Sequence, residues 1–120
     1  MRSLNDIHAW SRACDLAIGT LKLFTYSSDH RFCELTCRSA LTIPAKIAAG
    51  YESDSPDSYR QFLVVANGNC AELRTQLHIA QELGIIDRDR SIGLINESLE
   101  VSALLRGLIA WCGEHRHDER

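Results

Sequence analysis

One histidine and two cysteines stand close together in the first half of the chain. His30, Cys33 and Cys37 are spaced by three and four residues, which places their side chains on one face of a helix. Imidazole and thiolate are common zinc ligands, so this cluster is a candidate metal site. Zinc also needs a fourth ligand or an open position, and the sequence has no second pair of cysteines or histidines at standard spacing. Ordinary packing cysteines are therefore the preferred interpretation, and we expect no cofactor.

The other ionisable residues give little support for an enzyme. A nucleophilic cysteine needs a neighbouring base to lower its pKa. The remaining cysteines instead fall on apolar helical stripes: Cys14, Cys70 and Cys112. His78 lies near the edge of a buried face, where a polar contact is a simpler role than proton transfer. A di-iron bundle needs paired Glu-x-x-His motifs, and no such histidines accompany Glu72, Glu82 and Glu97. We expect a protein without catalytic activity.

Length and composition restrict the class of protein. The 120 residues suffice for one domain over residues 1–120, and 45% hydrophobic residues with only two prolines favour a helical globular protein. The formal charge is −3, with arginines dispersed among acids, so no concentrated basic face is indicated. Five cysteines spread over the presumed helices predict reduced thiols, and no apolar run could span a bilayer. We expect a cytoplasmic protein that does not contact a membrane.

Four amphipathic segments must position these side chains, near residues 6–26, 30–49, 56–84 and 90–114. The clearest is the third, in which Ser55 is the predicted N-cap, Pro56 occupies the first helical position and Gly84 provides the stop. Its apolar residues recur at spacings of three and four. They are Tyr59, Phe62, Ala66, Cys70, Leu73, Leu77 and Ala80. Gly68 interrupts this helix, and a close contact with a neighbouring helix would explain it.

The first two segments carry similar patterns. In the first, the main apolar stripe is Ile7, Trp10, Cys14, Ala17, Leu21 and Phe24, with Asn5 or Asp6 as cap. A weaker stripe flanks it, formed by Ala9, Ala13, Leu16, Thr20 and Leu23. The second segment, capped by Ser28 or Asp29, should bury Phe32, Leu35, Ser39, Ile43 and Ile47 and bend at Pro44. Short connections and the absence of a strand pattern predict an all-α, antiparallel, up-down-up-down four-helix bundle.

The fourth segment, capped by Asp87 or Asp89, has more apolar residues than one bundle core can cover. We expect Val101, Leu104 and Trp111 to lie at or near the surface and to be covered by a second subunit. The pattern therefore predicts self-association.

The middle of the chain resembles a known family. Residues 43–51 read IPAKIAAGY, residues 59–63 read YRQFL, and residues 66–68 read ANG. Together with EL at 72–73, QL at 76–77, Trp10, and LRGLI at 105–109, they resemble the bacterial four-helix-bundle proteins encoded in 23S rRNA intervening sequences. The resemblance implies a homopentameric, non-enzymatic bundle of mostly unassigned role. A related branch, the accessory variability determinant of diversity-generating retroelements, is a basic pentamer that works with a reverse transcriptase and RNA.

Two functions follow as expectations. The preferred one is a non-catalytic oligomeric scaffold, a ring that presents basic residues to a protein or RNA partner. These candidate contact residues are Arg31, Arg38, Lys46 and Arg60. The alternative is a small-ligand or metal-binding helical bundle that uses the His30, Cys33 and Cys37 face and the space around Pro44.

Overall fold

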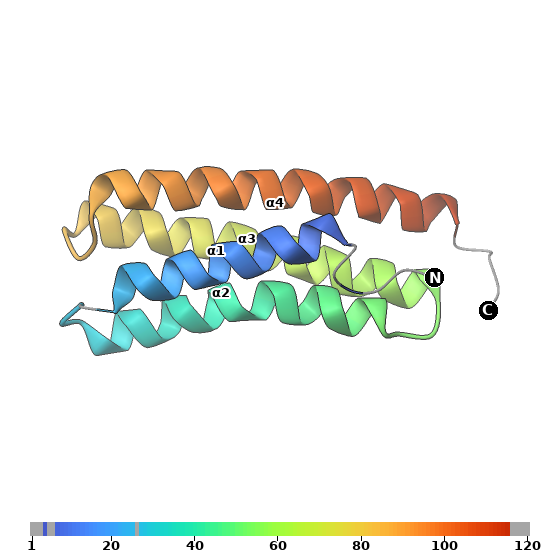
Figure 1. Ribbon diagram of the computed structural model, residues 1–120, viewed down its shortest axis with the longest axis horizontal. Coiled ribbons are helices and arrows are strands. Elements are labelled where there is room, and N and C mark those ends of the chain that lie inside the picture. Colours follow the sequence, from blue (N-terminus) through green and yellow to red (C-terminus); the bar gives the residue numbers. More distant parts are fainter. Residues whose placement is uncertain (1–3, 5–6, 26, 116–120) are drawn as a thin grey trace.

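Four long helices run side by side and alternate in direction (Figure 1). The computed structural model describes residues 4, 7–25 and 27–115. Its helices are α1 (His8–Phe24), α2 (His30–Tyr51), α3 (Pro56–Glu82) and α4 (Arg88–Glu114). Helices that follow one another in sequence pack together, and α4 closes the bundle against α1. The predicted all-α, antiparallel, up-down-up-down four-helix bundle is confirmed.

Side-chain caps define where three of the helices begin. The Ser58 amide donates to the Ser55 hydroxyl at 3.2 Å, as predicted for the start of α3. The choices left open at α2 and α4 are decided for Asp29 and Asp87, whose carboxylates accept from backbone amides at 3.0 and 2.9 Å. At α1 the residue before the helix is Ile7, which offers no side-chain cap, and the predicted caps Asn5 and Asp6 lie outside the described residues.

The end of α3 is a glycine stop, as the sequence predicted. Gly84 has φ +73°, a left-handed conformation that glycine adopts without strain. Its amide donates to the Gln81 carbonyl at 3.1 Å, and the Ile85 amide donates to the Ala80 carbonyl at 2.9 Å. These two bonds form a Schellman motif, which satisfies carbonyls that the helix end would otherwise leave free.

The second helix continues unbroken through Pro44 and reaches Tyr51, two residues beyond the predicted end at 49. Proline lacks an amide hydrogen, so the Ala40 carbonyl receives no helical bond from residue 44. The bend expected at this position stays a prediction.

The core face of α1 differs from the expected one. The flanking stripe that was judged weaker is the fully buried one: Ala9, Ala13, Leu16, Thr20 and Leu23. In the predicted main stripe, Ile7, Ala17 and Phe24 are buried as expected. Trp10 and Cys14 are instead half-buried, and Leu21 is exposed. The reason is that α1 packs against both α2 and α4, so its innermost line faces the junction of those two helices. Leu35 on α2 is also exposed instead of buried.

The core of α3 matches the prediction, except that Phe62 is half-buried and Leu63 is fully buried. On α4 the expected surface position of Val101 is wrong, because its side chain is 0% exposed within the single bundle. Leu104 is half-buried, whereas Trp111 is 47% exposed. Val101 is therefore a core residue of the monomer and no longer a subunit-contact candidate.

The close contact predicted at Gly68 is absent. A Cβ atom built on Gly68 would meet nothing within 4 Å, and the residue is exposed. The close approaches occur instead at Gly50, which faces α3, and at Gly19, which faces Leu94 of α4. Gly68 therefore has no packing role that the described part of this bundle explains.

Candidate functional site

The predicted metal cluster is only partly assembled. The Cys33 and Cys37 sulfurs lie 3.9 Å apart, and the Cys33 thiol lies 3.6 Å from the Phe24 carbonyl oxygen. His30 is exposed at the first turn of α2. Within the described ranges, no three His, Cys, Asp or Glu side chains are placed to hold a metal ion. Burial, and secondarily the neighbouring Cys33, raise the pKa of Cys37 to about 11, so this thiol stays protonated at neutral pH.

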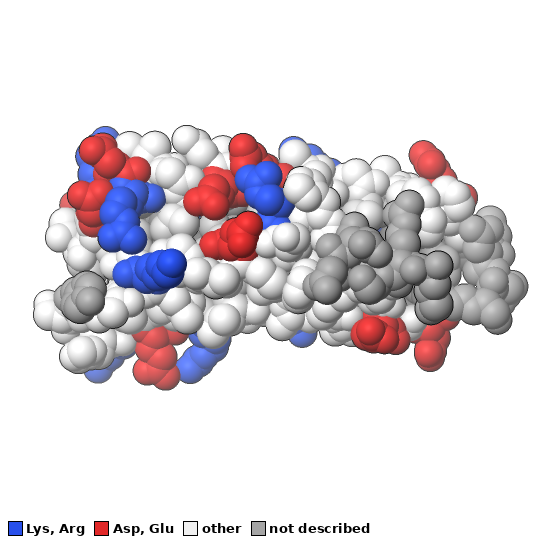
Figure 2. Space-filling view, in the orientation of Figure 1, with Lys and Arg blue, Asp and Glu red and all other residues white. Residues whose placement is uncertain are grey.

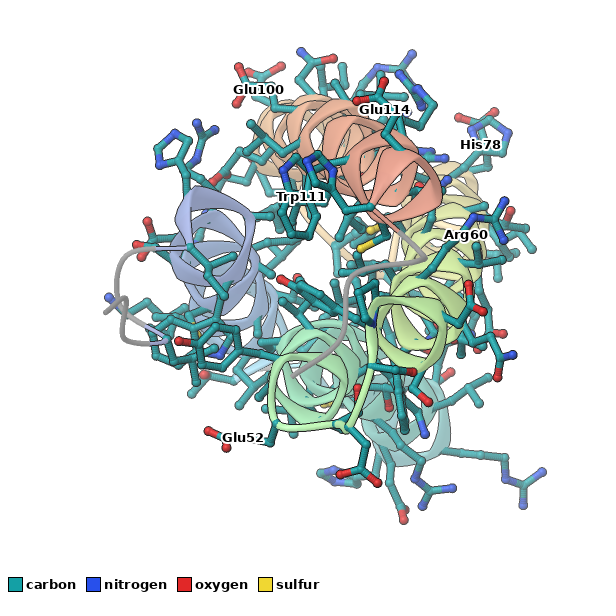
Figure 3. The ribbon with its side chains drawn as sticks, turned by 90° about the vertical axis from the view of Figure 1, so that its right-hand side faces the viewer. Glu52, Arg60, His78, Glu100, Trp111 and Glu114 are labelled. Atoms are coloured by element: carbon teal, nitrogen blue, oxygen red, sulfur yellow. The ribbon has the colours of Figure 1, made fainter. Side chains whose placement is uncertain are left out.

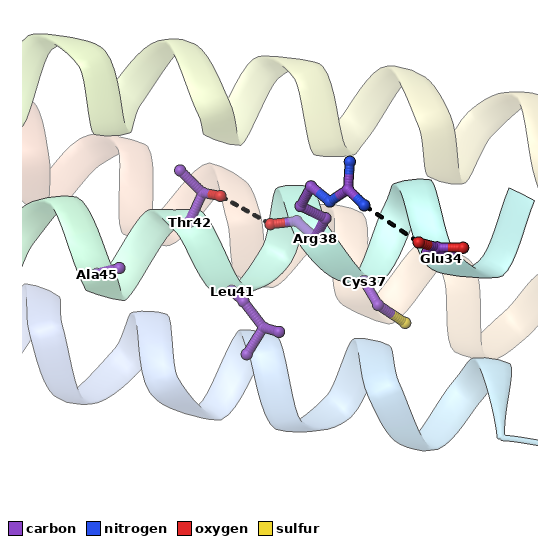
Figure 4. Close-up of a pocket in the computed structure, with 6 residues that line it drawn as sticks. All are labelled: Glu34, Cys37, Arg38, Leu41, Thr42 and Ala45. Atoms are coloured by element: carbon purple, nitrogen blue, oxygen red, sulfur yellow. Dashed lines mark hydrogen bonds and ion pairs between the residues drawn. The ribbon is translucent and has the colours of Figure 1, made fainter.

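A shallow groove lies next to this thiol pair (Figure 4). Its volume is about 430 Å³, and the described residues that line it all come from α2: Glu34, Cys37, Arg38, Leu41, Thr42 and Ala45. Arg38 forms an ion pair with Glu34 at 3.1 Å, and the Thr42 hydroxyl donates to the Arg38 carbonyl at 2.8 Å. Leu41 is 51% exposed. A groove with walls from one helix cannot enclose a small molecule, so the alternative ligand site near Pro44 gains no support here.

Two of the basic candidates on α2, Arg31 and Arg38, share one outward side. Arg31 and Arg38 are exposed and lie seven residues apart, about two helical turns. The nearby Glu34 carboxylate offsets the charge of Arg38. On the face shown in Figure 2, lysines and arginines are mixed with acidic side chains. The structure gathers no large basic surface on that face.

The other two basic candidates point to different neighbours. The Lys46 ammonium lies 5.9 Å from the centroid of the Phe62 ring, a cation–π contact between α2 and α3. Arg60 lies on the side of α3 that faces α4, where its charge lowers the pKa of Cys112 against the larger raising effect of burial (Figure 3). Arg60 is thus separated from the α2 residues with which the sequence analysis grouped it.

The remaining cysteines are poorly suited to nucleophilic chemistry. Burial is the main cause that raises the pKa of Cys14, Cys70 and Cys112. All five cysteines are free thiols. His78 is exposed on α3 and has no described hydrogen-bond partner that would orient it as a base (Figure 3).

A polar cluster between α3 and α4 was not anticipated. The Arg74 guanidinium donates to the Ser98 carbonyl at 3.3 Å and to the Ser98 and Ser102 hydroxyls at 3.4 and 3.0 Å. Both serines are buried, and no carboxylate pairs with Arg74 among the described ion pairs. All three of these acceptors are neutral groups of α4, so this cluster ties α4 to α3 instead of forming a reactive site.

The outer face of α3 carries a row of exposed residues without charge. Five exposed residues follow one another at spacings of four, three, four and four: Val64, Gly68, Ala71, Thr75 and Ile79. We call this set the α3 outer stripe. Its two large apolar members, Val64 and Ile79, are 45% and 43% exposed. None of its members carries a charge, whereas the solvent side of a surface helix normally does.

Comparison with known proteins identifies the family. The family model described as 23S rRNA-intervening sequence protein matches residues 5–107. The chain belongs to this family. Its fold is similar to the crystal structure of a protein with unknown function from the S23 ribosomal protein family of Bacteroides thetaiotaomicron. The TM-score is 0.78 at 19% identity, over 85% of this chain and 95% of that chain, which supports the fold alone. A comparison with curated proteins gives no match.

Two features of this 23S rRNA-intervening sequence protein were missed in the sequence analysis. The α3 outer stripe was not predicted, although the spacing of its residues can be read from the sequence. The core stripe of the same helix has more large apolar residues and is the stronger signal. The Arg74 cluster has no signal in the local sequence, because Ser98 and Ser102 reach Arg74 only when α4 packs against α3.

No described helix is long and apolar enough to cross a membrane.

Proposed function

We propose that this protein is a non-catalytic helical module that binds further copies of itself through the α3 outer stripe. The observation that carries the proposal is the uncharged, exposed surface in the middle of α3. From Gln61 to Ala71 the helix contains no charged residue, yet five of these eleven positions are exposed to solvent: Gln61, Val64, Val65, Gly68 and Ala71.

The presence of Gly68 in the α3 outer stripe supports a contact with a second helix. Glycine inside a helix costs roughly 1 kcal/mol relative to alanine. At position 50 the close contact with α3 leaves no room for a side chain, which explains why the residue is glycine. No such contact exists at Gly68, where a Cβ atom would meet nothing within 4 Å. A second helix that packs on the stripe would use this space, because small residues let two helix backbones approach closely. Gly68 and Ala71 form the shallow centre of the stripe, and Val64 and Ile79 form its apolar ends.

The occupant that best fits the stripe is another copy of the same chain. Spacings of three and four residues are those at which one helix presents a seam to a partner helix. A homo-oligomer brings such a seam with every subunit, so no separate partner is required. The family resemblance implies a ring of five, and we adopt that subunit number as part of the proposal.

Absence of catalysis is the second half of the proposal. Burial raises the pKa of four thiols, so they hold their protons at neutral pH and are weak nucleophiles: Cys14, Cys37, Cys70 and Cys112. The groove on α2 is lined by residues of one helix and does not bring a base next to a nucleophile. Both observations support a binding role over an enzymatic one.

Light scattering after size-exclusion chromatography tests the association. We expect the wild-type protein to have the mass of several chains at micromolar concentration. Val64→Glu and Ala71→Glu should each raise the dissociation constant by at least about 100-fold, because a buried unpaired carboxylate costs several kcal/mol. Ala49→Glu, at an exposed position of α2, is the matched control and should leave the mass unchanged.

Two outcomes would contradict the proposal. A wild-type mass equal to one chain would exclude self-association at that concentration. Dissociation by substitutions at Leu104 or Trp111, but not at Val64 or Ala71, would place the contact on α4, as the sequence analysis expected. Circular dichroism of each variant checks that the helices remain folded.

A further inference from the structure

One end of the bundle contains an aromatic cavity of about 310 Å³. It lies where α2 and α4 end and where α1 and α3 begin. Five of the described residues line it: Ile7, Tyr51, Tyr59, Leu108 and Trp111. Figure 3 looks onto this end of the bundle and shows Trp111 above the space between the helices. We call it the end cavity. It is separate from the groove on α2 and from the α3 outer stripe.

The walls of the end cavity are held in place by ring contacts. Trp111 stacks on His115 with 4.3 Å between ring centroids, and the His115 Nδ1 atom lies 2.8 Å from the Trp111 carbonyl oxygen. Tyr51 and Tyr59 meet edge to face, with 6.4 Å between centroids. The tryptophan ring therefore has a fixed partner on one side, and the two tyrosines brace each other. Walls of this kind favour a flat, apolar ligand.

Tyr59 supplies one polar group to this cavity. Its side chain is only 8% exposed, and its hydroxyl oxygen is not one of the buried side-chain atoms left without a partner among the described residues. Burial is the main cause that raises the pKa of Tyr59 to about 12, with smaller contributions from Cys112 and Tyr51. The phenol thus stays protonated and can donate.

The charges around the cavity do not favour an ion of either sign. Arg60 acts on Cys112 beside it, while the labelled Glu52 and Glu114 point outward at the same end (Figure 3). The five lining residues carry no charge at neutral pH. A buried ion would lose its hydration without gaining a direct partner here, so a neutral ligand is preferred.

We infer that the end cavity binds a small, uncharged aromatic molecule that accepts one hydrogen bond from the Tyr59 hydroxyl. The volume lies at the lower limit for ligand pockets, which fits a molecule of about two fused rings. The rings of Tyr51, Tyr59 and Trp111 contact its faces and edges, and Ile7 and Leu108 close the apolar sides.

A matched pair of probes tests this inference on the whole protein. 2-Acetylnaphthalene carries a carbonyl acceptor, whereas 2-ethylnaphthalene has nearly the same shape without one. Binding is followed by NMR through the indole N–H signal of Trp111, and the backbone amide signal of Gly84, in the turn between α3 and α4 at the opposite end of the bundle, serves as internal reference. We expect the acetyl probe to bind about fivefold to tenfold more tightly than the ethyl probe.

Two variants complete the test. Tyr59→Phe keeps the ring and removes the hydroxyl, so it should bring the affinity ratio of the two probes close to one and leave the ethyl probe unaffected. Leu108→Trp should fill the cavity and abolish binding of both probes. No shift of the Trp111 signal in the wild type would overturn the inference. A ratio that persists in Tyr59→Phe would overturn the role of Tyr59. Thermal melts confirm folding, and the subunit mass is measured separately, so failure here is distinguishable from failure of self-association.

Discussion

Gly50 of α2 lies directly against Phe62 of α3. A Cβ atom on Gly50 would stand 2.8 Å from the Phe62 Cβ and 2.9 Å from the Tyr59 ring. Both neighbours are held close to the α3 backbone, and the Tyr59 carbonyl oxygen would be only 3.3 Å away. The two helices can approach this closely only because residue 50 has no side chain. Their contact in turn fixes the position of Tyr59 beside the end cavity.

Gly50→Ala should therefore destabilise the protein, although alanine is the better helix former. Overpacking costs about 1–3 kcal/mol, which exceeds the gain of up to about 1 kcal/mol in helix propensity. The free energy of unfolding, measured with urea by circular dichroism, should fall.

Gly107→Ala is the matched control for this comparison. Gly107 is exposed inside α4, and a Cβ there would meet nothing within 4 Å. This variant should be more stable than the wild type by about 0.5–1 kcal/mol. Equal stability changes for both variants would contradict the close contact at Gly50.

Replacement of Arg74 should loosen α4 from α3. Arg74→Ala removes three hydrogen bonds to Ser98 and Ser102, both buried, and should cost about 1.5–3 kcal/mol of unfolding free energy. Arg74→Lys should recover only part of this loss, since an ammonium lacks the fork geometry of the guanidinium. Arg106→Ala, at an exposed position of α4, serves as control. Unchanged urea midpoints in Arg74→Ala would show that the cluster contributes nothing to stability.

The buried phenol of Tyr59 should make the fold sensitive to alkali. Its pKa rises from 10.0 to about 12 in the folded protein, so the unfolded chain releases this proton at lower pH than the folded chain does. Stability is therefore fully present below pH 10 and is lost as pH rises toward 12, by up to about 2–3 kcal/mol. Urea unfolding between pH 9 and 12 should show this slope, and Tyr59→Phe should flatten it. A slope that is identical in Tyr59→Phe would assign the effect to other groups, such as Cys37.

Contact with RNA is expected to be weak and strongly dependent on salt. Each phosphate contact releases counterions, with a slope of about 0.7–0.9 per contact in a plot of log affinity against log salt. The double variant Arg38→Ala and Lys46→Ala should lower both affinity and slope, whereas Arg60→Ala, on the α4 side of α3, should have less effect. A binding assay on structured RNA that stays flat at low ionic strength would leave a protein partner as the hypothesis to test.

The number of helices and the start and end of α3 could be predicted from the sequence, because they depend on residues that are close together in the chain. Ser55, Pro56 and Gly84 set the limits of α3 through bonds to residues within one turn, and the structure keeps those bonds. The core stripe of α3 was predictable for a similar reason, since a spacing of three and four residues is a property of one helix alone.

The placement of surfaces was harder to predict, because it depends on where neighbouring helices lie. Val101 was expected at the surface and is buried. Because α4 packs against both α1 and α3, a wider part of its circumference is covered than contact with one helix would cover. Gly68 and Gly50 cannot be told apart by residue type, yet one is open and the other is in close contact.

The sequence alone thus determined four helices, the cap of α3, the bundle class and the family, because propensity, periodicity and turn chemistry act over a few residues. The tertiary structure decided which of two stripes on α1 enters the core, which glycine meets a neighbour, and which side chains line the end cavity. Those outcomes depend on the rotation of each helix about its axis, which only simultaneous packing against two neighbours fixes.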